Sequence, residues 1–424
     1  MLNAVEYFSH LISENKNGKA ESICSICSSN SYVISAALDE GLRTGRPVLI
    51  EATANQVNQY GGYTGMRPAD FAAYVKDEAK KVGFDEDMLI LGGDHLGPLV
   101  WSNEPEASAM RKAVELVTEF ASAGFQKIHL DCSMRLADDD INSALTVETV
   151  ARRAALLAGA VEANATIKPV YIIGSEVPIP GGATEAENGL DVTHPEDLTK
   201  EYNAFKKAFF DAGLSDAWSR VIGVVVQPGV EFGDNQVFLY DRGKAKDLID
   251  TAKRFSGIIL EGHSTDYQPT ECLNNMREDG IAILKVGPAL TFAAREAIFA
   301  LEKIEKALYT SEPEAGYSDF ENILETIMLE LPSNWIKHYH GNENELVLMR
   351  RYSLSDRSRY YMENPQVKAA ITRLEKNINS CTIPIGLLHQ YLPSVAETVI
   401  AGKIGKDTAS IIKENVCNCI RTYY

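Results

Sequence analysis

One complete strand–helix–strand unit is visible in residues 88–131, which read MLILGGDHLGPLVWSNEPEASAMRKAVELVTEFASAGFQKIHLD. The apolar runs 88–93 and 126–131 predict two short buried strands. Between them, four apolar residues recur at the spacing of an amphipathic helix: Met110, Val114, Val117 and Ala121. Near-continuous apolar strands are required by a parallel sheet that is covered on both faces, so this unit predicts an α/β fold.

The same alternation continues along the chain on both sides of this unit. Eight apolar runs are strand candidates: 22–27, 47–51, 88–93, 126–131, 168–175, 220–227, 257–261 and 281–286. Eight strand–helix units over roughly 300 residues predict a (β/α)8 TIM barrel, a fold of ~250 residues that tolerates insertions. A doubly wound open sheet is the alternative, but the count of eight and the absence of a Gly-rich dinucleotide loop after the first strand weigh against it.

The character of the sequence changes after the eighth unit. TSEPEAGYSD (310–319) resembles a linker, and the following part mixes helical patterns with aromatic and basic residues, notably MRRYSLSDRSRYY (349–361). We therefore expect a barrel over 1–308 and a mostly helical C-terminal extension over 309–424 that packs on it. We expect the protein to form a homo-oligomer, and the extension could also provide the interface between its subunits. We expect the acidic insertion 181–202 to cap the barrel mouth.

Composition limits the class of protein and its partners. The 424 residues are 45% hydrophobic and 24% charged, which is ordinary for a globular protein with a sizeable core. A net charge of −18 argues against nucleic acid or an anionic membrane as partner, because both attract basic surfaces. No apolar run reaches the ~20 residues that span a bilayer, and no secretory signal is visible. Cys24 and Cys27 lie in an apolar run and are interpreted as buried reduced thiols, so we expect a cytoplasmic protein.

Barrel enzymes build their sites from residues at the C-terminal ends of the strands. Nearly every predicted strand ends in ionisable or hydrogen-bonding side chains: Glu51, Asp94, His95, Asp131, Glu176, Gln227, Glu261, His263, Asp266 and Lys285. Carboxylates that share a pocket repel one another unless protons or a cation neutralise them. Ligands of these types from different strands suit zinc or a similar divalent metal with an open coordination position.

His95 and His263 are the best metal-ligand candidates, and Glu176 is the next. Asp131 and Glu261 are further possibilities, and a hydrogen-bonded structural role is the alternative for either histidine alone. The side chain of His129 can face either way from its strand, so its role is left open. The candidates for catalytic proton transfer or charge stabilisation are Asp94, Asp131, Glu176 and Asp266. A carboxyl group in a closed pocket has a pKa that burial raises and a metal lowers, which suits acid–base work, although Asp266 could instead cap a helix.

Phosphate capture in such barrels uses the loops after strands seven and eight and a helix N-terminus. Ser264, Gly287 and the backbone amides of 287–290 are candidates for this role, with Glu51 and Gln227 as further substrate contacts. Arg357 and Arg359 could reach in from the extension, although a solvated basic surface is the alternative. Lys285 could form a Schiff base, but beside possible metal ligands a charge-stabilising role is preferred.

These and other segments resemble one known family over nearly the whole chain. The segments are LIEATANQVNQYGGYTGMRPADF (49–71), LGGDHLGP (91–98), KIHLDCSM (127–134), IGSEVPIPGG (173–182), VVVQPGVEF (224–232), HSTDYQ (263–268), LKVGPA (284–289), AAREAIFAL (293–301) and RYSLSDRSRYY (351–361). They closely resemble the Z-type subunit family of tagatose-1,6-bisphosphate aldolase. An older name for such proteins is tagatose-6-phosphate kinase, but the sequence has no P-loop or kinase-type Gly-rich loop, so we discount kinase activity.

The resemblance extends to class II fructose- and tagatose-bisphosphate aldolases, which are zinc barrels that work without a Schiff base. In those enzymes an Asp-His pair after strand three supplies an acid–base aspartate and a zinc ligand, and Asp94 and His95 match it. His263 matches a second zinc histidine. The third lies in a Gly-Thr-Ala-His-Gly loop where this sequence has 173–182, so Glu176 would have to replace it.

The resemblance implies two alternative functions in the catabolism of tagatose and galactitol. Some Z-type proteins are described as metal-dependent 4-epimerases that interconvert tagatose 6-phosphate and fructose 6-phosphate. Others are described as non-catalytic subunits that stabilise and activate the catalytic Y-type aldolase. We expect metal-dependent retro-aldol and aldol chemistry on tagatose 6-phosphate or tagatose 1,6-bisphosphate, with epimerisation at carbon four as the first hypothesis and the stabilising subunit as the alternative.

Overall fold

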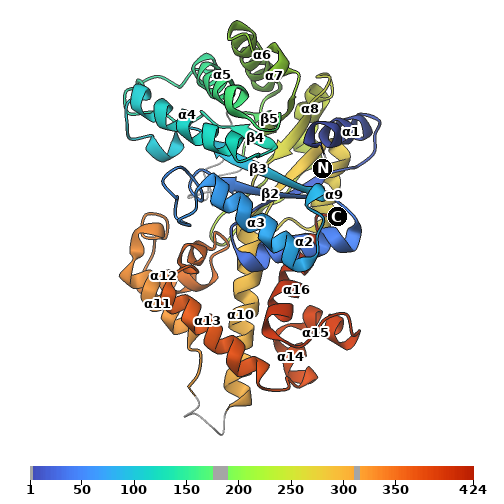
Figure 1. Ribbon diagram of the computed structural model, residues 1–424, viewed down its shortest axis with the longest axis vertical. Coiled ribbons are helices and arrows are strands. Elements are labelled where there is room, and N and C mark those ends of the chain that lie inside the picture. The colour runs from blue at the N-terminus through green and yellow to red at the C-terminus, as the bar shows by residue number, and fades with distance from the viewer. Residues whose placement is uncertain (1–2, 175–189, 310–315) are drawn as a thin grey trace.

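The computed structural model of the chain describes residues 3–174, 190–309 and 316–424. Its central feature is a closed barrel of eight parallel strands in the order β1-β10-β9-β6-β5-β4-β3-β2 (Figure 1). The strands are β1 Ile23–Cys27, β2 Val48–Thr53, β3 Leu89–Leu96, β4 Lys127–Leu130, β5 Val170–Ile173, β6 Val221–Val226, β9 Ile259–Gly262 and β10 Ile281–Val286. The predicted TIM barrel is confirmed, and the open doubly wound sheet is wrong. A small antiparallel hairpin, β7 Glu231–Phe232 and β8 Val237–Phe238, was not predicted.

Helices surround the barrel and follow it in the chain. Those up to the last strand's helix are α1 Ala4–Lys16, α2 Ser31–Thr44, α3 Pro68–Val82, α4 Glu106–Ser122, α5 Val147–Asn164, α6 Pro195–Asp211, α7 Ser215–Trp218, α8 Arg242–Ala252, α9 Thr270–Asp279 and α10 Pro288–Leu308. Those after it are α11 Phe320–Glu330, α12 Glu343–Tyr352, α13 Pro365–Asn379, α14 Ile385–Tyr391, α15 Pro393–Ile400 and α16 Thr408–Arg421, with a 3-10 turn η5 at Arg357–Tyr361. None of the described helices has the length and apolarity that a membrane crossing requires.

Local sequence explains where these helices begin and end. The side chain of Asn30 accepts hydrogen bonds from the amides of Tyr32 and Val33 and so caps α2, which ends at Gly45 in the left-handed conformation. In α4 the predicted apolar face is buried at Met110 and Val117. The seven cysteines are free, and Cys24 is buried as expected, whereas Cys27 is only partly buried.

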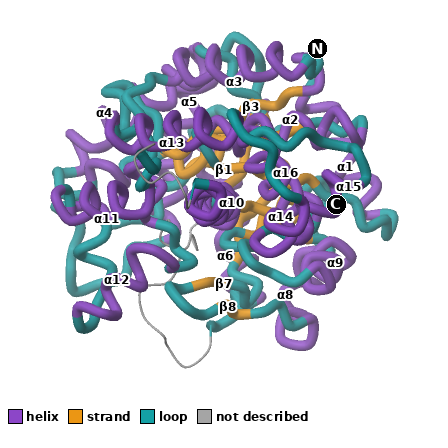
Figure 2. The backbone as a smooth tube through the Cα atoms, turned by 90° about the horizontal axis from the view of Figure 1, so that it is seen from below, coloured by secondary structure: helices purple, strands orange, loops and turns teal. Residues whose placement is uncertain are grey.

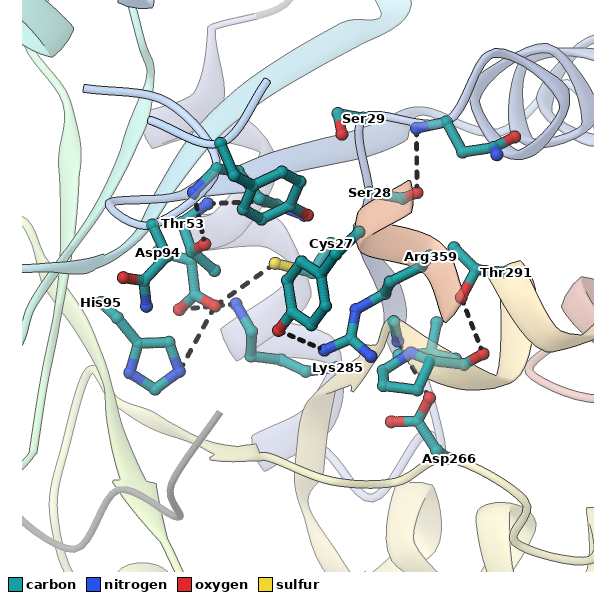
Figure 3. Close-up of a pocket in the computed structure, with 18 of the residues that line it drawn as sticks. Cys27, Ser28, Ser29, Thr53, Asp94, His95, Asp266, Lys285, Thr291 and Arg359 are labelled. Atoms are coloured by element: carbon teal, nitrogen blue, oxygen red, sulfur yellow. Dashed lines mark hydrogen bonds and ion pairs between the residues drawn. The ribbon is translucent and has the colours of Figure 1, made fainter. Parts of the chain in front are cut away.

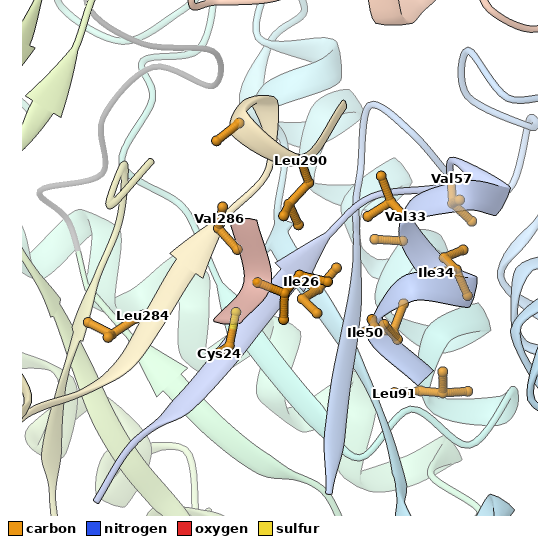
Figure 4. Close-up of a cluster of buried hydrophobic side chains, with 14 of the residues drawn as sticks. Cys24, Ile26, Val33, Ile34, Ile50, Val57, Leu91, Leu284, Val286 and Leu290 are labelled. Atoms are coloured by element: carbon orange, nitrogen blue, oxygen red, sulfur yellow. The ribbon is translucent and has the colours of Figure 1, made fainter. Parts of the chain in front are cut away.

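Two apolar layers hold the barrel together. The larger layer fills the space between the strands and the outer helices, and Figure 4 shows the part where Ile26 and Ile50 meet Val33 and Ile34 of α2. The smaller layer lies on the inner faces near the beginnings of the strands and packs against α1, whose Phe8 is completely buried. Complete burial of such a side chain contributes roughly 1.5–3 kcal/mol. Because α1 covers this end, polar inner residues can gather only towards the opposite end.

The helices after the barrel gather on one side of it. Figure 1 shows α10 running out of the barrel into this group, and Figure 2 shows α10 end-on among α11, α13, α14 and α16. Helix α16 packs on both α2 and α10. The C-terminal segment is therefore helical, as predicted.

The acidic insertion differs from its prediction. Residues 181–189 of this segment lie outside the described residues. Residues 195–202 do not cap the barrel mouth, because they form the first turns of α6, which packs beside α5.

Candidate active site

A cavity of about 1040 Å³, including its open mouth, lies at the C-terminal ends of the strands (Figure 3). Its wall is built from the ends of β1, β2, β3, β9 and β10, from the β7 hairpin and from residues 359–363 of the extension. The predicted site residues on this wall are Asp94, His95, His263, Ser264, Asp266, Lys285, Gly287 and Arg359. The structure therefore brings together residues from five strand ends that are far apart in the sequence.

Three imidazole rings meet at this end of the barrel. The ring centres of His95, His129 and His263 are 5.0 to 5.3 Å apart. Each ring has one nitrogen beside a carboxylate oxygen, at 3.0 Å for His95 and Asp131, 2.9 Å for His129 and Asp94, and 2.9 Å for His263 and Glu261. A carboxylate on one ring nitrogen orients the ring and leaves the other nitrogen available to a metal. The Nε2 atom of His129 is buried and has no hydrogen-bond partner within the described part of the chain.

The donor atoms of this cluster fit a divalent metal. Asp94, His129, Glu261 and His263 are buried, and each offers a ligand atom within 4.8 Å of the others. Mixed nitrogen and oxygen donors of this kind suit zinc or a similar ion. The group contains the predicted ligand His263 and adds His129, whose role the sequence left open. Glu176, predicted as ligand and catalytic residue, lies outside the described residues.

His95 lies next to this group but is not part of it. Burial lowers the pKa of His263 to about 4, so its ring is neutral and can bind a metal. Burial would lower the pKa of His95 as well, but the charges of Asp94 and Asp131 raise it above its ordinary value. The predicted catalytic residue Asp131 does not reach the cavity, because its carboxylate is buried against His95 and Ser133. Asp131 therefore orients His95.

Two buried lysines lie among the carboxylates of the barrel interior. The Nζ atom of Lys127 is 2.7 Å from Glu51 and 2.8 Å from Glu261, and all three side chains are completely buried. Lys285 contacts Glu51 and lies 2.8 Å from Asp94. The predicted role of Glu51 in substrate binding needs correction, because its carboxylate lies below the cavity wall and is held by both lysines. A metal is thus not the only positive charge available to these carboxylates.

These ion pairs set the charge of Lys285 and Asp94. Burial alone would lower the pKa of Lys285, but Asp94, Glu51 and Glu261 together raise it well above its ordinary value. Burial would raise the pKa of Asp94, but His95 and Lys285 hold it well below its usual range. The neighbouring carboxylates therefore favour the ammonium form of Lys285, whereas a Schiff base requires the free amine.

The amides predicted to bind phosphate already have a partner. The carboxylate of Asp266 accepts hydrogen bonds from the backbone of Gly287 (3.0 Å) and Ala289 (2.8 Å), so it caps the N-terminus of α10. Burial raises the pKa of Asp266 to about 6. The expected phosphate site at 287–290 therefore requires correction, because an acidic side chain of the protein occupies two of those amides.

Glu231 is a further buried acid that the sequence did not indicate. Burial raises its pKa to about 7, and its carboxylate accepts a hydrogen bond from the backbone amide of Phe232 (2.9 Å), which lies on the cavity wall. The signal was its place in VVVQPGVEF after the sixth strand, where Gln227 was expected to contact substrate. Gln227 does not line the cavity, because its side chain accepts hydrogen bonds from Gly229 (2.8 Å) and Val230 (3.0 Å) and closes its own turn.

The two arginines of the extension have different positions. Figure 3 shows the guanidinium of Arg359 directed into the cavity, near Lys285 and Asp266. It donates to Tyr360 Oη (2.8 Å) and to backbone carbonyls, and it pairs with no carboxylate among the described residues. Arg357 does not line the cavity, because it is buried against the carbonyl of Asn334. A partly buried cation that meets no carboxylate in the described part of the chain favours an anionic ligand, and of the two arginines only Arg359 faces the cavity.

Contacts with the C-terminal helices also support the rim. Tyr63 of the β2–α3 loop packs edge-to-face on Tyr360 at 4.9 Å, which joins the barrel to the extension across the cavity. The hydroxyl of Tyr423 donates to the carbonyl of Thr265 (2.8 Å), two residues after His263. The rim is therefore completed by side chains from both barrel and extension.

Comparisons with known proteins are consistent across nearly the full length. Residues 8–424 match the family model described as D-tagatose-1,6-bisphosphate aldolase subunit GatZ/KbaZ-like. The chain is 43% identical over 417 residues to the D-tagatose-1,6-bisphosphate aldolase subunit GatZ of Salmonella dublin, covering 97% of each chain. It is 45% identical over 417 residues to the protein of the same name from Escherichia coli, covering 97% of this chain and 98% of that one. The crystal structure of a probable tagatose 6 phosphate kinase from Sinorhizobium meliloti 1021 has a TM-score of 0.88 and 42% identity, covering 95% of this chain and 99% of that one.

Proposed function

The chain belongs to the GatZ/KbaZ-like family of D-tagatose-1,6-bisphosphate aldolase subunits, and from this premise we propose that it is an enzyme of phosphorylated ketohexoses. The proposed reaction is metal-dependent cleavage and re-formation of a carbon–carbon bond, which converts tagatose 6-phosphate into fructose 6-phosphate. The observation that carries the proposal is the cavity itself. It places Asp94 and His263, two of the four buried residues that could hold a metal, on the same wall as Arg359, which pairs with no carboxylate among the described residues.

We assign the metal to His129, Glu261 and His263, which form the described group of possible ligands together with Asp94, and we leave Asp94 free to act as the base. When bound there, a divalent ion such as zinc supplies a Lewis acid that stabilises negative charge on the substrate oxygens. Two groups support this assignment: the neutral ring of His263, and the Nε2 atom of His129, which has no hydrogen-bond partner among residues 3–174, 190–309 and 316–424.

The protein groups on the wall then carry the proton transfers. The ionised carboxylate of Asp94 accepts the proton of the hydroxyl on carbon four, and the bond between carbons three and four breaks. This leaves an aldehyde and a three-carbon enediolate, whose charge the ammonium of Lys285 helps to stabilise. The aldehyde turns over within the cavity, the bond re-forms on its other face, and the proton returns to the oxygen. Asp266 is the second candidate for proton transfer, because its pKa of about 6 lies near neutral pH.

Charge on the wall favours a monophosphate over a bisphosphate. Lys285 is paired with carboxylates, and Asp266 holds the α10 amides. Within the described part of the wall, Arg359 is thus the cation that is available to a phosphate group. The sequence contains no P-loop or kinase-type Gly-rich loop, and we do not propose kinase activity.

The test is direct conversion by the purified chain. Tagatose 6-phosphate is incubated with the protein and a divalent metal, and fructose 6-phosphate and triose products are measured before and after EDTA treatment. We expect fructose 6-phosphate only with the metal present, and we expect Asp94→Asn to abolish it. If neither product forms under any of these conditions, the catalytic proposal is wrong.

A second candidate function is a non-catalytic subunit that stabilises a Y-type tagatose-1,6-bisphosphate aldolase. The relatives from Salmonella dublin and Escherichia coli are named as subunits of such an aldolase, which motivates this alternative. Co-purification and the thermal stability of the Y-type protein, with and without this chain, test it. A Y-type protein that neither binds this chain nor gains stability from it would exclude this role.

A further inference from the structure

The turn that carries Arg359 is fixed to the barrel by one buried carboxylate. Asp356 precedes η5 and has a left-handed backbone with φ of 43°. Its Oδ2 atom accepts a hydrogen bond from Thr291 (2.6 Å), and its Oδ1 atom accepts from Arg295 (2.7 Å) and from Ser358 (2.8 Å). An unpaired buried carboxylate would be strongly destabilising, so this set of donors determines where Asp356 can lie.

The two long-range donors, Thr291 and Arg295, lie one turn apart on α10, and only the first of them lines the cavity. Thr291 lies in the first turn of α10 and lines the cavity. The guanidinium of Arg295 lies over the rings of Phe292 (4.4 Å) and Phe299 (5.1 Å), and it also donates to the carbonyl of Arg351. Asp356 therefore connects the extension to α10 at the point where α10 forms the wall.

Asp356 also contacts Arg359 directly. Its backbone carbonyl accepts from the guanidinium of Arg359 (3.0 Å) and from the backbone amide of the same residue (3.1 Å). The other face of the guanidinium is held by Tyr360, whose ring packs against Tyr63. Figure 3 shows the guanidinium directed into the cavity, and this direction depends on the backbone carbonyls of Ser355 and Asp356 that hold it.

We propose that Asp356 is a positioning residue. By binding α10, it holds the turn that carries Arg359 in place, so that the guanidinium can bind the anionic group of the ligand. This role rests on the proposed function of the cavity as a sugar-phosphate site. Asp356 does not touch the ligand in this arrangement, and its effect on binding passes through Arg359.

A double-mutant cycle tests this dependence with inorganic phosphate as the probe. Asn accepts the left-handed conformation as Asp does, so Asp356→Asn removes the charge without adding backbone strain. Phosphate affinity is measured by calorimetry and by the rise in melting temperature with phosphate concentration at constant ionic strength, for Asp356→Asn, Arg359→Met and the double variant. Asp319→Asn is the matched control, since Asp319 also has a positive φ (51°) in the extension but precedes α11 away from the cavity and makes no side-chain bond to the backbone amides of that helix.

We expect Asp356→Asn to weaken phosphate binding about tenfold or more, and Asp319→Asn to leave it unchanged. The double variant should bind as Arg359→Met does, because Asp356 has nothing to position once the guanidinium is gone. Multiplicative losses, a fully retained affinity in Asp356→Asn, or a fully retained affinity in Arg359→Met would each overturn the proposal. If Asp356→Asn does not fold, Thr291→Val removes one of the same hydrogen bonds and replaces it in the cycle.

The conversion of tagatose 6-phosphate by the wild-type protein is measured separately. Conversion combined with multiplicative losses would leave the proposed function standing and refute the positioning role. If the protein does not convert the substrate but the losses in the cycle are not multiplicative, the proposed function is refuted and the positioning role stands.

Discussion

Replacing Lys127 tests whether the buried ion pairs hold the barrel together. Lys127→Met keeps the length of the side chain but removes the ammonium group that lies between Glu51 and Glu261. Glu51 keeps Lys285 as a partner, whereas Glu261 keeps the ring of His263 at 2.9 Å and Lys285 only at 3.8 Å. Loss of one member of a buried pair costs about 3–5 kcal/mol, because a buried charge is left uncompensated. We expect a loss of this size in the free energy of unfolding.

The assay is urea unfolding followed by tryptophan fluorescence and circular dichroism. The matched control is Lys168→Met, because Lys168 is 58% exposed and pairs with Glu162 at 2.6 Å on the surface. An exposed pair contributes about 0–1 kcal/mol, so this control should lose little stability. Adding Glu51→Gln to Lys127→Met should restore part of the loss, since one of the two carboxylates is then neutral.

Two results would refute this reasoning. The first is a Lys127→Met protein that is no less stable than Lys168→Met. The second is a double variant, Lys127→Met with Glu51→Gln, that is less stable than Lys127→Met alone. Removing one negative charge should reduce the repulsion between the buried carboxylates and raise the stability.

Three further predictions concern single residues of the site. Lys285 stays protonated, so borohydride reduction in the presence of tagatose 6-phosphate should give no sugar adduct by mass spectrometry, and an adduct at Lys285 would contradict this. Burial raises the pKa of Glu231 to about 7. The protonated carboxyl group therefore contributes its full share to the free energy of unfolding below about pH 4.5, and this contribution is lost as the pH rises through 7. At 1.36 kcal/mol per pKa unit, the loss of unfolding free energy is about 3 kcal/mol. The unfolding free energy of Glu231→Gln should lack this pH dependence. If the variant keeps the pH dependence of the wild type, other groups cause it. His129→Ala should lower the amount of bound metal measured by elemental analysis. The control is His389→Ala, which replaces an exposed histidine and should bind as much metal as the wild type. Equal metal contents in the two variants would show that His129 is not a ligand.

The strands could be predicted because their outer faces are apolar throughout. In β4, Ile128 and Leu130 pack towards the helices, while Lys127 and His129 point into the barrel. This polar–apolar alternation at period two was visible in KIHLD and would have placed Lys127 and His129 together. Because the run as a whole is apolar, this alternation was not recognised. The role of His129 was therefore left open, and Lys127 was missed.

The rim residues could be predicted as a group but not in their individual roles. Parallel strands bring their C-terminal ends together, which is why Asp94, His263 and Lys285 lie on one cavity wall. Which partner each side chain takes depends on tertiary contacts that no local pattern carries. Asp266 binds the amides of α10 across a gap of more than twenty residues, so the amides expected to hold phosphate are taken.

The contribution of the extension was the hardest part to predict. Arg357 and Arg359 are two positions apart and equally basic in the sequence, yet only Arg359 reaches the cavity. The difference depends on Asp356, whose donors on α10 lie 65 and 61 positions earlier in the chain. Such a contact is decided by packing of whole helices and has no signature in spacing.

The hydrogen bond from Tyr423 to Thr265 has a consequence for the order of assembly, because the two residues are 158 positions apart. During synthesis all eight strands leave the ribosome well before Tyr423 does, and closing so long a loop is slow compared with forming adjacent strands. The barrel can therefore gain its secondary structure first, whereas the loop next to His263 settles only after α16 has docked. In refolding, the circular dichroism signal should return before the ability to bind a ligand.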